Sequence, residues 1–303
     1  MGVTDVSIIL LNWNGNADTI ECLRSIKLHV YSINLQVILV DNASNVPLSK
    51  EELRATGIED IIYIENNKND GFAEGNNIGM REARKHNPKY IFLLNNDTVI
   101  VDDTITRMFE FMEKNESFAV CSAVNYYYSN PDEVWRAGCF NNFKNGTQKC
   151  VEKFDKQANE PVEVDFVPGS TLMLRTSVLD KVGLLDGRYF AYYEENDLCI
   201  CIKKAGYKVC FLPDTKILHK VGKSSDSVTK YYLRVRNKLL FYKKFSTKFW
   251  FIYIYYKEFI KNLIKAGQFY VKNRKGTYFK VLYLAYSDFS KSVFNEGSLK
   301  KLS

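Results

Sequence analysis

The feature that most constrains the fold is the alternation of short apolar runs with helix-like segments over the first hundred residues. Four runs have the length and composition of buried strands, and polar or turn-forming residues follow each of them. They are Val6–Leu11, Val37–Val40, Ile61–Ile64 and Tyr90–Leu94. Apolar residues recur at helical spacing in 18–28 and 75–85. Strands of this kind, separated by helices, predict an α/β fold with a mostly parallel sheet flanked by helices.

Sheets of this type bind ligands at the carboxyl ends of their strands. Polar side chains are concentrated at those ends, in 12–14, 41–44, 66–77 and 95–97. We therefore expect a ligand site formed by these loops. The chain contains no GxGxxG, Walker, GxSxG or HExxH motif, so the usual signatures of dehydrogenases, P-loop enzymes and hydrolases are missing.

The later sequence divides into a less regular middle and a distinct tail. In the middle we expect helices at Thr176–Val182 and from Glu194 to Ala205, followed by a strand at Val209–Leu212. From residue 226 the chain becomes rich in Lys, Tyr and Phe, with apolar groups at helical spacing. This shift predicts a catalytic domain at 1–225 and a basic, aromatic, helical tail at 226–303.

Charge is divided unevenly between these two parts. The chain has a formal net charge of +7, but residues 226–303 carry 17 Lys and Arg against 4 Asp and Glu. They also hold 20 of the 43 aromatic residues. Tyr and Trp mixed with Lys suit a lipid headgroup region. The tail could instead pack on the catalytic domain or form a homodimer contact. Binding of single-stranded nucleic acid is a third and less favoured alternative.

Cysteine usage and apolar run lengths bear on the compartment. The seven cysteines are odd in number and form no CxxC pair, so we expect reduced thiols in a cytosolic protein. The N-terminus enters the first apolar run directly, without the basic region of a signal peptide. No apolar window of 18 residues exists, so no spanning helix is expected.

Acidic residues and one histidine are the candidates for chemistry. Asp97 follows a strand, where it could bind a divalent cation or simply form a turn. Glu194, Glu195 and Asp197 open a helix, where they could cap the helix dipole, or where crowding could suit one of them to act as a general base. His219 could be structural, or it could act with the following Gly222–Ser225 segment on phosphate oxygens.

Taken together, these segments resemble family 2 glycosyltransferases, in particular the bacterial rhamnosyltransferase-like branch. The resemblance covers most of residues 6–225, and the matching segments occur in the family's order. They are VSIILLNWNG (6–15), VILVDNAS (37–44), NNKNDGFAEGNNIGM (66–80), YIFLLNNDTVI (90–100), the run from VPGST to GYKV (167–209) and HKVGKSS (219–225). The resemblance implies a GT-A fold, a Rossmann-like nucleotide-diphospho-sugar transferase fold, and sugar transfer with inversion.

The resemblance also implies roles for individual residues. The donor nucleotide sugar would be bound by Asn12, Asn14, Asp41, Gly71, Phe72, Gly75, Asn76 and Asn96. Asp41 would accept the N3–H of the base, which uracil and thymine share. Asp97 and His219 would bind Mg²⁺ or Mn²⁺, and the Glu194–Glu195 pair would supply the base, with Glu195 preferred.

Two positions depart from the family pattern. Asn95 stands where the DxD metal motif has its first acidic residue, which leaves the metal more dependent on Asp97, the diphosphate and His219. Glu195 stands where Asp is usual, so its carboxylate reaches one methylene further. Glu194 therefore stays open as an alternative base.

The resulting hypothesis is a cytoplasmic enzyme, peripheral at the inner face of the cell membrane, that builds cell-surface polysaccharide. It would move a sugar from a dTDP- or UDP-sugar, rhamnose being suggested by the family branch, to a glycan or lipid-linked acceptor. A sugar-phosphate nucleotidyltransferase is disfavoured, because Asn12–Gly15 lacks the basic residue that a triphosphate requires. A catalytically inactive sugar-nucleotide-binding or scaffold protein of the same fold is the other alternative. Nucleic acid is not an expected partner.

Overall fold

The computed structural model describes residues 4–302 except 30, 159, 222–226 and 275. The chain forms two compact units. The first comprises Met1–Phe140, Cys150–Leu185 and Glu195–Val221, and the second comprises Asn141–Lys149, Asp186–Glu194 and Gly222–Ser303. The second unit therefore groups the C-terminal residues with two segments from within the first 225. The division expected from composition, between 225 and 226, stays a prediction.

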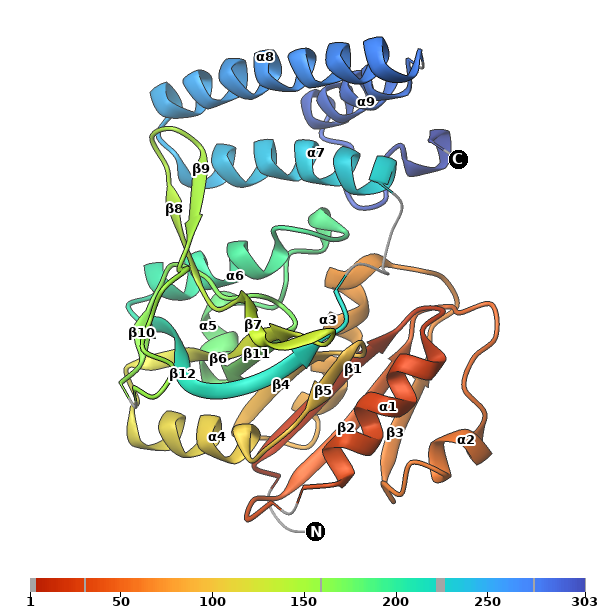
Figure 1. Cartoon of the computed structure of the whole chain (residues 1–303), viewed down its shortest axis with the longest axis vertical. Helices are drawn as coiled ribbons and strands as arrows, with labels where there is room; N and C mark the ends of the chain where they lie inside the picture. Colours follow the sequence, from red (N-terminus) through yellow and green to blue (C-terminus); the bar gives the residue numbers. More distant parts are fainter. Residues whose placement is uncertain (1–3, 30, 159, 222–226, 275, 303) are drawn as a thin grey trace. The chain divides into compact units, whose positions relative to one another are not determined.

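The first unit contains the large sheet, whose strand order is β10-β12-β6-β11-β4-β1-β2-β3 (Figure 1). The four strands predicted from the sequence are β1 (Val6–Asn12), β2 (Leu35–Asp41), β3 (Ile61–Glu65) and β4 (Tyr90–Asn95). They pair in parallel, so that their carboxyl ends share one edge. The mostly parallel sheet of the α/β prediction is confirmed.

The remaining strands extend this sheet from β4. The added strands are β5 (Thr98–Ile100), β6 (Phe118–Tyr127), β7 (Asn130–Arg136), β10 (Val162–Glu163), β11 (Thr171–Arg175) and β12 (Lys208–His219). Strand β11 is antiparallel to both β4 and β6, whereas β12 runs parallel to β6. Strand β12 continues to His219, beyond the Val209–Leu212 run expected from the sequence, and its last residues pair with β5.

Both faces of the sheet are buried, which explains why its strands are continuously apolar. Alternate residues of β1 enter different cores: Ile9 lies in one hydrophobic cluster, and Ile8 and Leu10 lie in the other. The first cluster includes residues of α3 (Gly71–Arg84), α5 (Thr176–Val182) and α6 (Glu194–Lys204). The second includes residues of α1 (Asn16–Lys27), α2 (Lys50–Arg54) and α4 (Thr104–Lys114). A fully buried aliphatic side chain contributes about 1.5–3 kcal/mol, so the two cores stabilise the sheet together.

Helix α3 begins earlier than the sequence pattern suggested. The sequence pattern indicated helical spacing at 75–85, whereas the helix already begins at Gly71. Gly71 has φ +79°, a conformation that favours glycine. At Gly79, an added Cβ would lie 2.5 Å from Ile9 Cγ2. The glycines therefore let α3 approach β1 closely.

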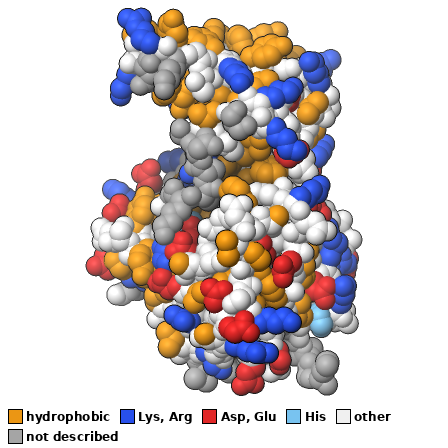
Figure 2. All heavy atoms as spheres, turned by 90° about the vertical axis from the view of Figure 1, so that its right-hand side faces the viewer, with side chains coloured by type: hydrophobic (Ala, Val, Ile, Leu, Met, Phe, Trp, Pro, Cys, Tyr) orange, Lys and Arg blue, Asp and Glu red, His pale blue; other side chains and the backbone are white. Residues whose placement is uncertain are grey.

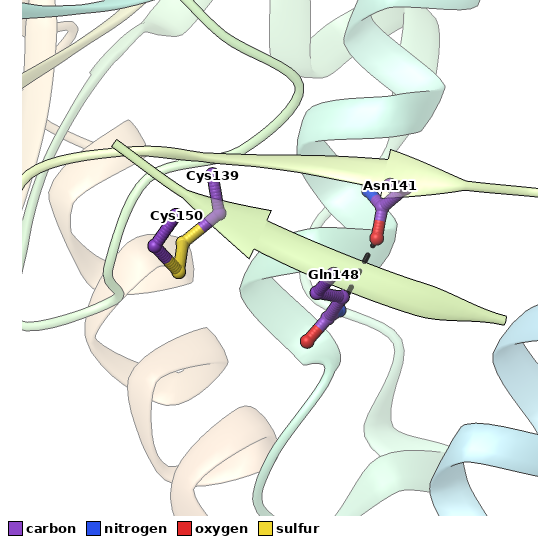
Figure 3. Close-up of a disulfide and its surroundings, with 4 residues drawn as sticks. All are labelled: Cys139, Asn141, Gln148 and Cys150. Carbon is purple, nitrogen blue, oxygen red and sulfur yellow. Dashed lines mark hydrogen bonds between the residues drawn. A yellow bond between two sulfur atoms is a disulfide. The ribbon is translucent and has the colours of Figure 1, made fainter. Parts of the chain in front are cut away.

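Strands β8 (Cys139–Asn142) and β9 (Thr147–Cys150) form a separate two-stranded hairpin. Figure 3 shows a disulfide between Cys139 and Cys150 at its ends and a hydrogen bond from Gln148 to Asn141 (3.2 Å) further along. The expectation that all seven cysteines are reduced is wrong for this pair. Hairpin pairing brings their Cα atoms to 3.9 Å, a proximity that a separation of 11 residues does not reveal by itself.

The second unit is helical, as expected for the tail. It contains α7 (Ser227–Phe245), α8 (Lys248–Asn273), α9 (Thr277–Ser290) and the short 3₁₀ helices η1 (Gly187–Tyr189) and η2 (Leu299–Lys301). Its core joins α7 to α9 through side chains such as Tyr232, Leu239, Val281 and Ala285. Across the part of the chain that is described, no helix is both long and apolar enough to cross a membrane.

Candidate active site

The carboxyl ends of β1 and β2 are joined by buried polar side chains. The parallel register places Asn12 next to Asp41, and Asn12 Nδ2 donates to Asp41 Oδ2 at 2.8 Å. Asp41 Oδ1 accepts the backbone N–H of Ser44 at 2.7 Å. Both residues are only 0–2% exposed. Asp41 is thus held in one orientation as a buried acceptor at the carboxyl edge of the sheet.

Asn14 and Asn96 connect two further loops to this pair. The Asn14 side chain accepts the Asn45 N–H at 2.8 Å, and its own N–H donates to Ser44 Oγ at 2.8 Å. Asn96 Nδ2 donates to Asn12 Oδ1 at 3.3 Å and to Thr19 Oγ1 at 2.8 Å. The structure therefore brings together four predicted residues: Asn12, Asn14, Asp41 and Asn96.

The segment before and within α3 is held to the same edge through Asn42. Its Oδ1 accepts from Asn66 Nδ2 (3.1 Å) and from the Asp70 N–H (3.2 Å). Its Nδ2 donates to Asn69 Oδ1 (2.9 Å) and to the Gly71 carbonyl (3.1 Å). All the hydrogen-bonding capacity of this buried amide is directed at the loop, so Asn42 fixes where α3 starts.

The predicted residues of α3 lie in its first turns. Asn76 Nδ2 donates to the Phe72 carbonyl at 2.9 Å. A Cβ at Gly75 would lie 2.6 Å from Leu11 Cδ1 and 3.2 Å from Asn42 Nδ2. The lack of a side chain at Gly75 therefore allows α3 to pack closely against β1. Among the four predicted residues of α3, Phe72 has the largest side chain.

Asp97 and His219 meet although 121 residues separate them in the sequence. The register of β5 and β12 pairs Thr98 with His219, which brings Asp97 Oδ1 within 3.1 Å of His219 Nε2. The two side chains are 15% and 7% exposed. The Trp135 ring lies edge-on to the imidazole, with ring centroids 4.6 Å apart. The predicted metal pair is therefore assembled by the fold.

The donor atoms of this pair suit a divalent cation only in part. Among the described residues, no group of three or more His, Cys, Asp and Glu side chains could hold a metal. Asp97 contributes a carboxylate and His219 an imidazole, and Asn95 Oδ1 is a buried acceptor without a hydrogen-bond partner. Mg²⁺ and Mn²⁺ commonly take their remaining ligands from phosphate and water. The residues present fit a cation that binds together with a diphosphate.

Glu195 lies close to Gly169 and Phe72. A Cβ at Gly169 would lie 3.4 Å from Glu195 Cβ and 3.6 Å from Phe72 Cε1. The neighbouring Ser170 carbonyl accepts the Asn95 N–H at 3.0 Å. Glu195 is half-buried, whereas Glu194 is 4% exposed and is grouped with the second unit. Of the two candidate bases, Glu195 is the one placed beside Phe72.

Lys220, next to His219, is occupied by acidic partners. Its Nζ lies 2.7 Å from Asp18 and 2.6 Å from Glu21. Burial by itself lowers the pKa of Lys220, but these hydrogen bonds outweigh it and raise the pKa. The Gly222–Ser225 segment, expected to contact phosphate, lies outside the described residues.

Sequence reasoning assigned no individual role to three residues that organise this edge: Thr19, Asn42 and Ser44. Asn42 and Ser44 stand inside the quoted VILVDNAS segment, so that segment contained a usable signal for them. Thr19 lies within α1, where its sequence context gives no signal. Its role follows only from its hydrogen bonds to Asn12 (3.1 Å) and Asn96 (2.8 Å).

Comparison with curated proteins finds related sugar transferases. The dTDP-rhamnosyl transferase RfbF of Shigella flexneri is 27% identical over 221 residues, which cover 70% of this chain and 72% of the relative. The low-salt glycan biosynthesis hexosyltransferase Agl10 of Haloferax volcanii is 24% identical over 247 residues, covering 78% and 75%.

Solved structures share the fold at low identity. GalNAc-T7, crystallised with UDP, GalNAc and Mn²⁺, superposes with a TM-score of 0.60 at 15% identity over 78% of this chain. The aligned region spans only 51% of that structure. The mannosyltransferase PcManGT of Pyrobaculum calidifontis, in complex with GDP-Man and Mn²⁺, has a TM-score of 0.59 at 14% identity, covering 99% and 79%. These similarities show the GT-A fold.

Membership of a family rests on the match to a family model. The family described as Glycosyl transferase family 2 matches residues 7–183, more than half of the chain. That region contains the strand ends at which Asn12, Asp41 and Asp97 lie. This chain therefore belongs to glycosyltransferase family 2 and is a glycosyltransferase with the GT-A fold.

Proposed function

We propose that this glycosyltransferase moves a sugar such as rhamnose from a dTDP- or UDP-sugar, with inversion, to a hydroxyl of a lipid-linked or polysaccharide acceptor. The observation that carries the proposal is that Glu195 and Phe72 flank Gly169, beside the strand end that continues into Asp97. A carboxylate and a candidate diphosphate site thus belong to one edge of the sheet. Cell-surface polysaccharide synthesis is the pathway class that uses such acceptors.

Asp41 reads the base in this proposal. Each of its carboxylate oxygens accepts one hydrogen bond within the protein and retains capacity for another. The N3–H of uracil or thymine donates to it, and Asn12 and Asn14 line the same loop. RfbF is named for a dTDP-sugar and GalNAc-T7 was crystallised with UDP, so both dTDP and UDP are candidate donor nucleotides.

The diphosphate lies toward Asp97 and His219. Their side chains would hold Mg²⁺ or Mn²⁺, which supplies Lewis-acid stabilisation of the departing diphosphate. The Mn²⁺ in the two solved neighbours supports this part of the proposal.

Glu195 acts as the general base. It accepts the proton of the acceptor hydroxyl as that oxygen attacks the anomeric carbon on the face opposite the diphosphate. Its half-buried position leaves it accessible to an acceptor, whereas Glu194 is almost fully buried. A general base contributes about 10²–10⁴-fold to a rate.

Calorimetric titration of UDP and dTDP, with and without Mn²⁺, tests the donor site. We expect metal-dependent binding of one nucleotide, lost in Asp97→Ala. Glu195→Gln should keep that binding and lose about 10²–10⁴-fold in transfer. Glu194→Gln is the matched control and should retain most of the activity. Full transfer by Glu195→Gln would overturn the assignment of the base.

The alternative is a catalytically inactive nucleotide-sugar-binding protein or scaffold of the same fold, which Asn95 in the metal motif keeps open. It predicts nucleotide binding without transfer to any lipid-linked or polysaccharide acceptor. It also predicts that Glu195→Gln changes nothing measurable. Donor hydrolysis and transfer assays on the wild-type protein separate the two.

We further propose that α8 binds an anionic membrane surface, which brings lipid-linked acceptors to the enzyme at the inner face of the cell membrane. Large apolar side chains lie exposed along the length of this helix. Phe249, Ile252, Tyr253, Tyr256, Ile260, Leu263, Ile264 and Val271 are 42–70% exposed. Figure 2 shows hydrophobic side chains next to Lys and Arg on the surface of the helical unit.

The inner face of α8 is, by contrast, partly polar. Glu258 is 4% exposed and pairs with Lys238 at 2.8 Å, and Asn262 is 6% exposed and bonds Tyr231 at 2.9 Å. The helix thus places polar groups inside and a long apolar stripe outside. An exposed apolar stripe of this kind indicates an interaction surface.

Lysines border the stripe and favour a lipid partner. A groove on α8 is lined by Lys257, Ile260, Lys261, Ile264, Lys265 and Gln268. Apolar groups that enter the acyl boundary and ammonium groups that meet anionic headgroups are the pattern of interfacial helices.

Flotation with phosphatidylglycerol-containing vesicles tests this surface. We expect the protein to float with them, to float less with pure phosphatidylcholine, and to lose flotation in Ile260→Asp/Ile264→Asp. Leu28→Asp, at an exposed apolar site of the first unit, is the control. A dimer in light scattering that the double variant dissociates would overturn the lipid assignment in favour of a homodimer contact.

A further inference from the structure

The residues immediately before the proposed base have an unusual backbone. Phe190, Tyr192 and Tyr193 have φ of 64°, 73° and 83°. Bulky side chains rarely adopt positive φ, and such residues persist where surrounding contacts enforce them. Glu195 follows Tyr193 by two positions in the chain. The strained segment therefore leads directly into the start of α6.

Phe190 is the centre of a γ-turn of the rare, strained kind. Its φ and ψ are 64° and −62°, and the Ala191 N–H donates to the Tyr189 carbonyl at 2.8 Å. Such turns are uncommon because the side chain of the central residue is crowded. The turn requires contacts from elsewhere to be populated.

Asn237, on α7, provides those contacts. Its Nδ2 lies 2.8 Å from the Tyr189 carbonyl, 2.8 Å from that of Ala191 and 2.9 Å from that of Tyr192. The residue is fully buried. One amide thus holds the carbonyl groups on both sides of the γ-turn.

Arg236 fixes the orientation of that amide. Its Nε and Nη2 donate to Asn237 Oδ1 at 3.0 and 2.9 Å, so the Asn237 NH₂ group must face the turn. Arg236 Nη2 also donates to the Tyr189 carbonyl at 3.1 Å, and Nη1 donates to the Asn295 carbonyl at 2.7 Å. Arg236 is itself fully buried.

Helix α7 also holds the rings of the segment. The Arg234 guanidinium lies 5.0 Å from the centre of the Tyr192 ring, and the Tyr193 and Phe241 rings are 5.4 Å apart. Side chains and backbone of the strained segment are therefore both restrained by one helix of the second unit.

We propose that Asn237, oriented by Arg236, is a positioning residue for sugar transfer: by holding the γ-turn at Phe190 it fixes the start of α6 and hence the carboxylate of Glu195. The proposal rests on Glu195 being the base. It gives the C-terminal helices a part in the reaction that is distinct from binding a membrane, because α7 restrains the turn through polar contacts within its own unit.

Asn237→Ala tests the proposal, with Asn262→Ala as matched control. Asn262 is also a buried asparagine of the second unit, but its amide bonds Tyr231 and the Glu258 carbonyl instead of the turn. We expect Asn237→Ala to lower kcat by about 10–100-fold, as small displacements of catalytic groups do. The Kd of UDP or dTDP should stay within about twofold, since the donor residues are untouched. The acid limb of the kcat–pH profile should shift, because it reports the ionisation of the base.

Equal losses of kcat in the two variants, without a shift in the pH profile, would overturn the proposal in favour of a purely structural role. Should Asn237→Ala fail to fold, Arg236→Lys keeps the charge and removes the paired contacts to Asn237. It should lower kcat in the same way, and unchanged kcat and pH profile would again overturn the proposal. Full activity of Glu195→Gln would instead remove the proposed function on which this inference depends, so the two failures are distinguishable.

Discussion

His219 Nε2 lies 3.1 Å from Asp97 Oδ1, at the point where the end of β12 pairs with the start of β5. The Lys220 N–H donates to the Asp97 carbonyl at 2.9 Å, so backbone and side chains hold the two residues together. A carboxylate and an imidazole in this arrangement can share one cation, provided that a diphosphate completes its ligands.

If Asp97 and His219 hold the cation as proposed, His219→Ala should raise the Mn²⁺ concentration required for half-maximal transfer by at least about tenfold, because one of the two proposed protein ligands is lost. Transfer measured across a metal titration is the test. Trp135→Phe, which retains an aromatic ring beside the imidazole, is the control and should change the midpoint little. Activity that resists chelators and is unaffected in His219→Ala would contradict the metal assignment.

Gly79→Ala should destabilise the protein by about 1–3 kcal/mol, because its Cβ would lie 2.5 Å from Ile9 Cγ2 in a close-packed core. The free energy of unfolding in urea measures the effect. Gly267→Ala in α8 is the matched control, since nothing lies within 4 Å of its added Cβ. There the higher helix propensity of alanine should stabilise by about 0.5–1 kcal/mol. Equal effects at both sites would contradict the close approach of α3 to β1.

Lys220→Met should lower stability at neutral pH by about 1 kcal/mol, a modest value because Glu21 is 42% exposed. The hydrogen bond from Lys220 lowers the pKa of Glu21, so this contribution is present above the unfolded carboxyl pKa and lost as pH falls through the folded value. At the alkaline end, the raised pKa of Lys220 keeps the ion pair's contribution to stability until the pH rises through the pKa of Lys220 in the folded protein. The difference between wild type and variant should therefore shrink below about pH 4.

Urea unfolding at several pH values measures that difference. Lys114→Met is the control, because Lys114 is 75% exposed and lies 3.7 Å from Glu110. A Lys220 effect that grows on acidification would show that the stabilising pair is misassigned.

Thiol counting tests the Cys139–Cys150 disulfide. Unfolded, unreduced protein should expose five reactive thiols, and prior reduction should raise the number to seven. A count of seven without reduction would show that Cys139 and Cys150 do not form a disulfide.

In the folded protein we expect Cys201 to react first with iodoacetamide, because it is the only one of the five free cysteines that is not buried. Burial raises the pKa of Cys22 and Cys199 to about 12, which leaves almost no thiolate at neutral pH. Mass spectrometry after brief labelling identifies the modified residue. Earlier labelling of Cys22 would contradict its burial.

Much of the first unit could be predicted because its strands and helices carry local periodicity. The runs at Val6, Val37, Ile61 and Tyr90 all became parallel strands. Where prediction failed, local pattern was ambiguous. Helical spacing was visible only at 75–85, yet α3 begins at Gly71. The glycines at 75 and 79 are explained only by the close approach of the neighbouring strand β1.

The candidate site could be predicted in part for a similar reason. Asn12 and Asp41 end neighbouring parallel strands, so topology alone brings them together. The contact of Asp97 with His219 was expected only from the family resemblance. Thr19 could not be found, because its partners lie on other elements.

The sequence by itself determined the α/β order, the polar strand ends and the basic, aromatic character of the C-terminal helices, because period, composition and turn residues are local properties. Tertiary structure alone decided which distant groups meet. It joined Cys139 to Cys150, placed Asn237 against the turn at Phe190 and directed the apolar stripe of α8 outward. These outcomes depend on side-chain packing and on the closure of long loops. The free energies of both depend on residues far apart in the sequence, so no short segment of the chain determines them.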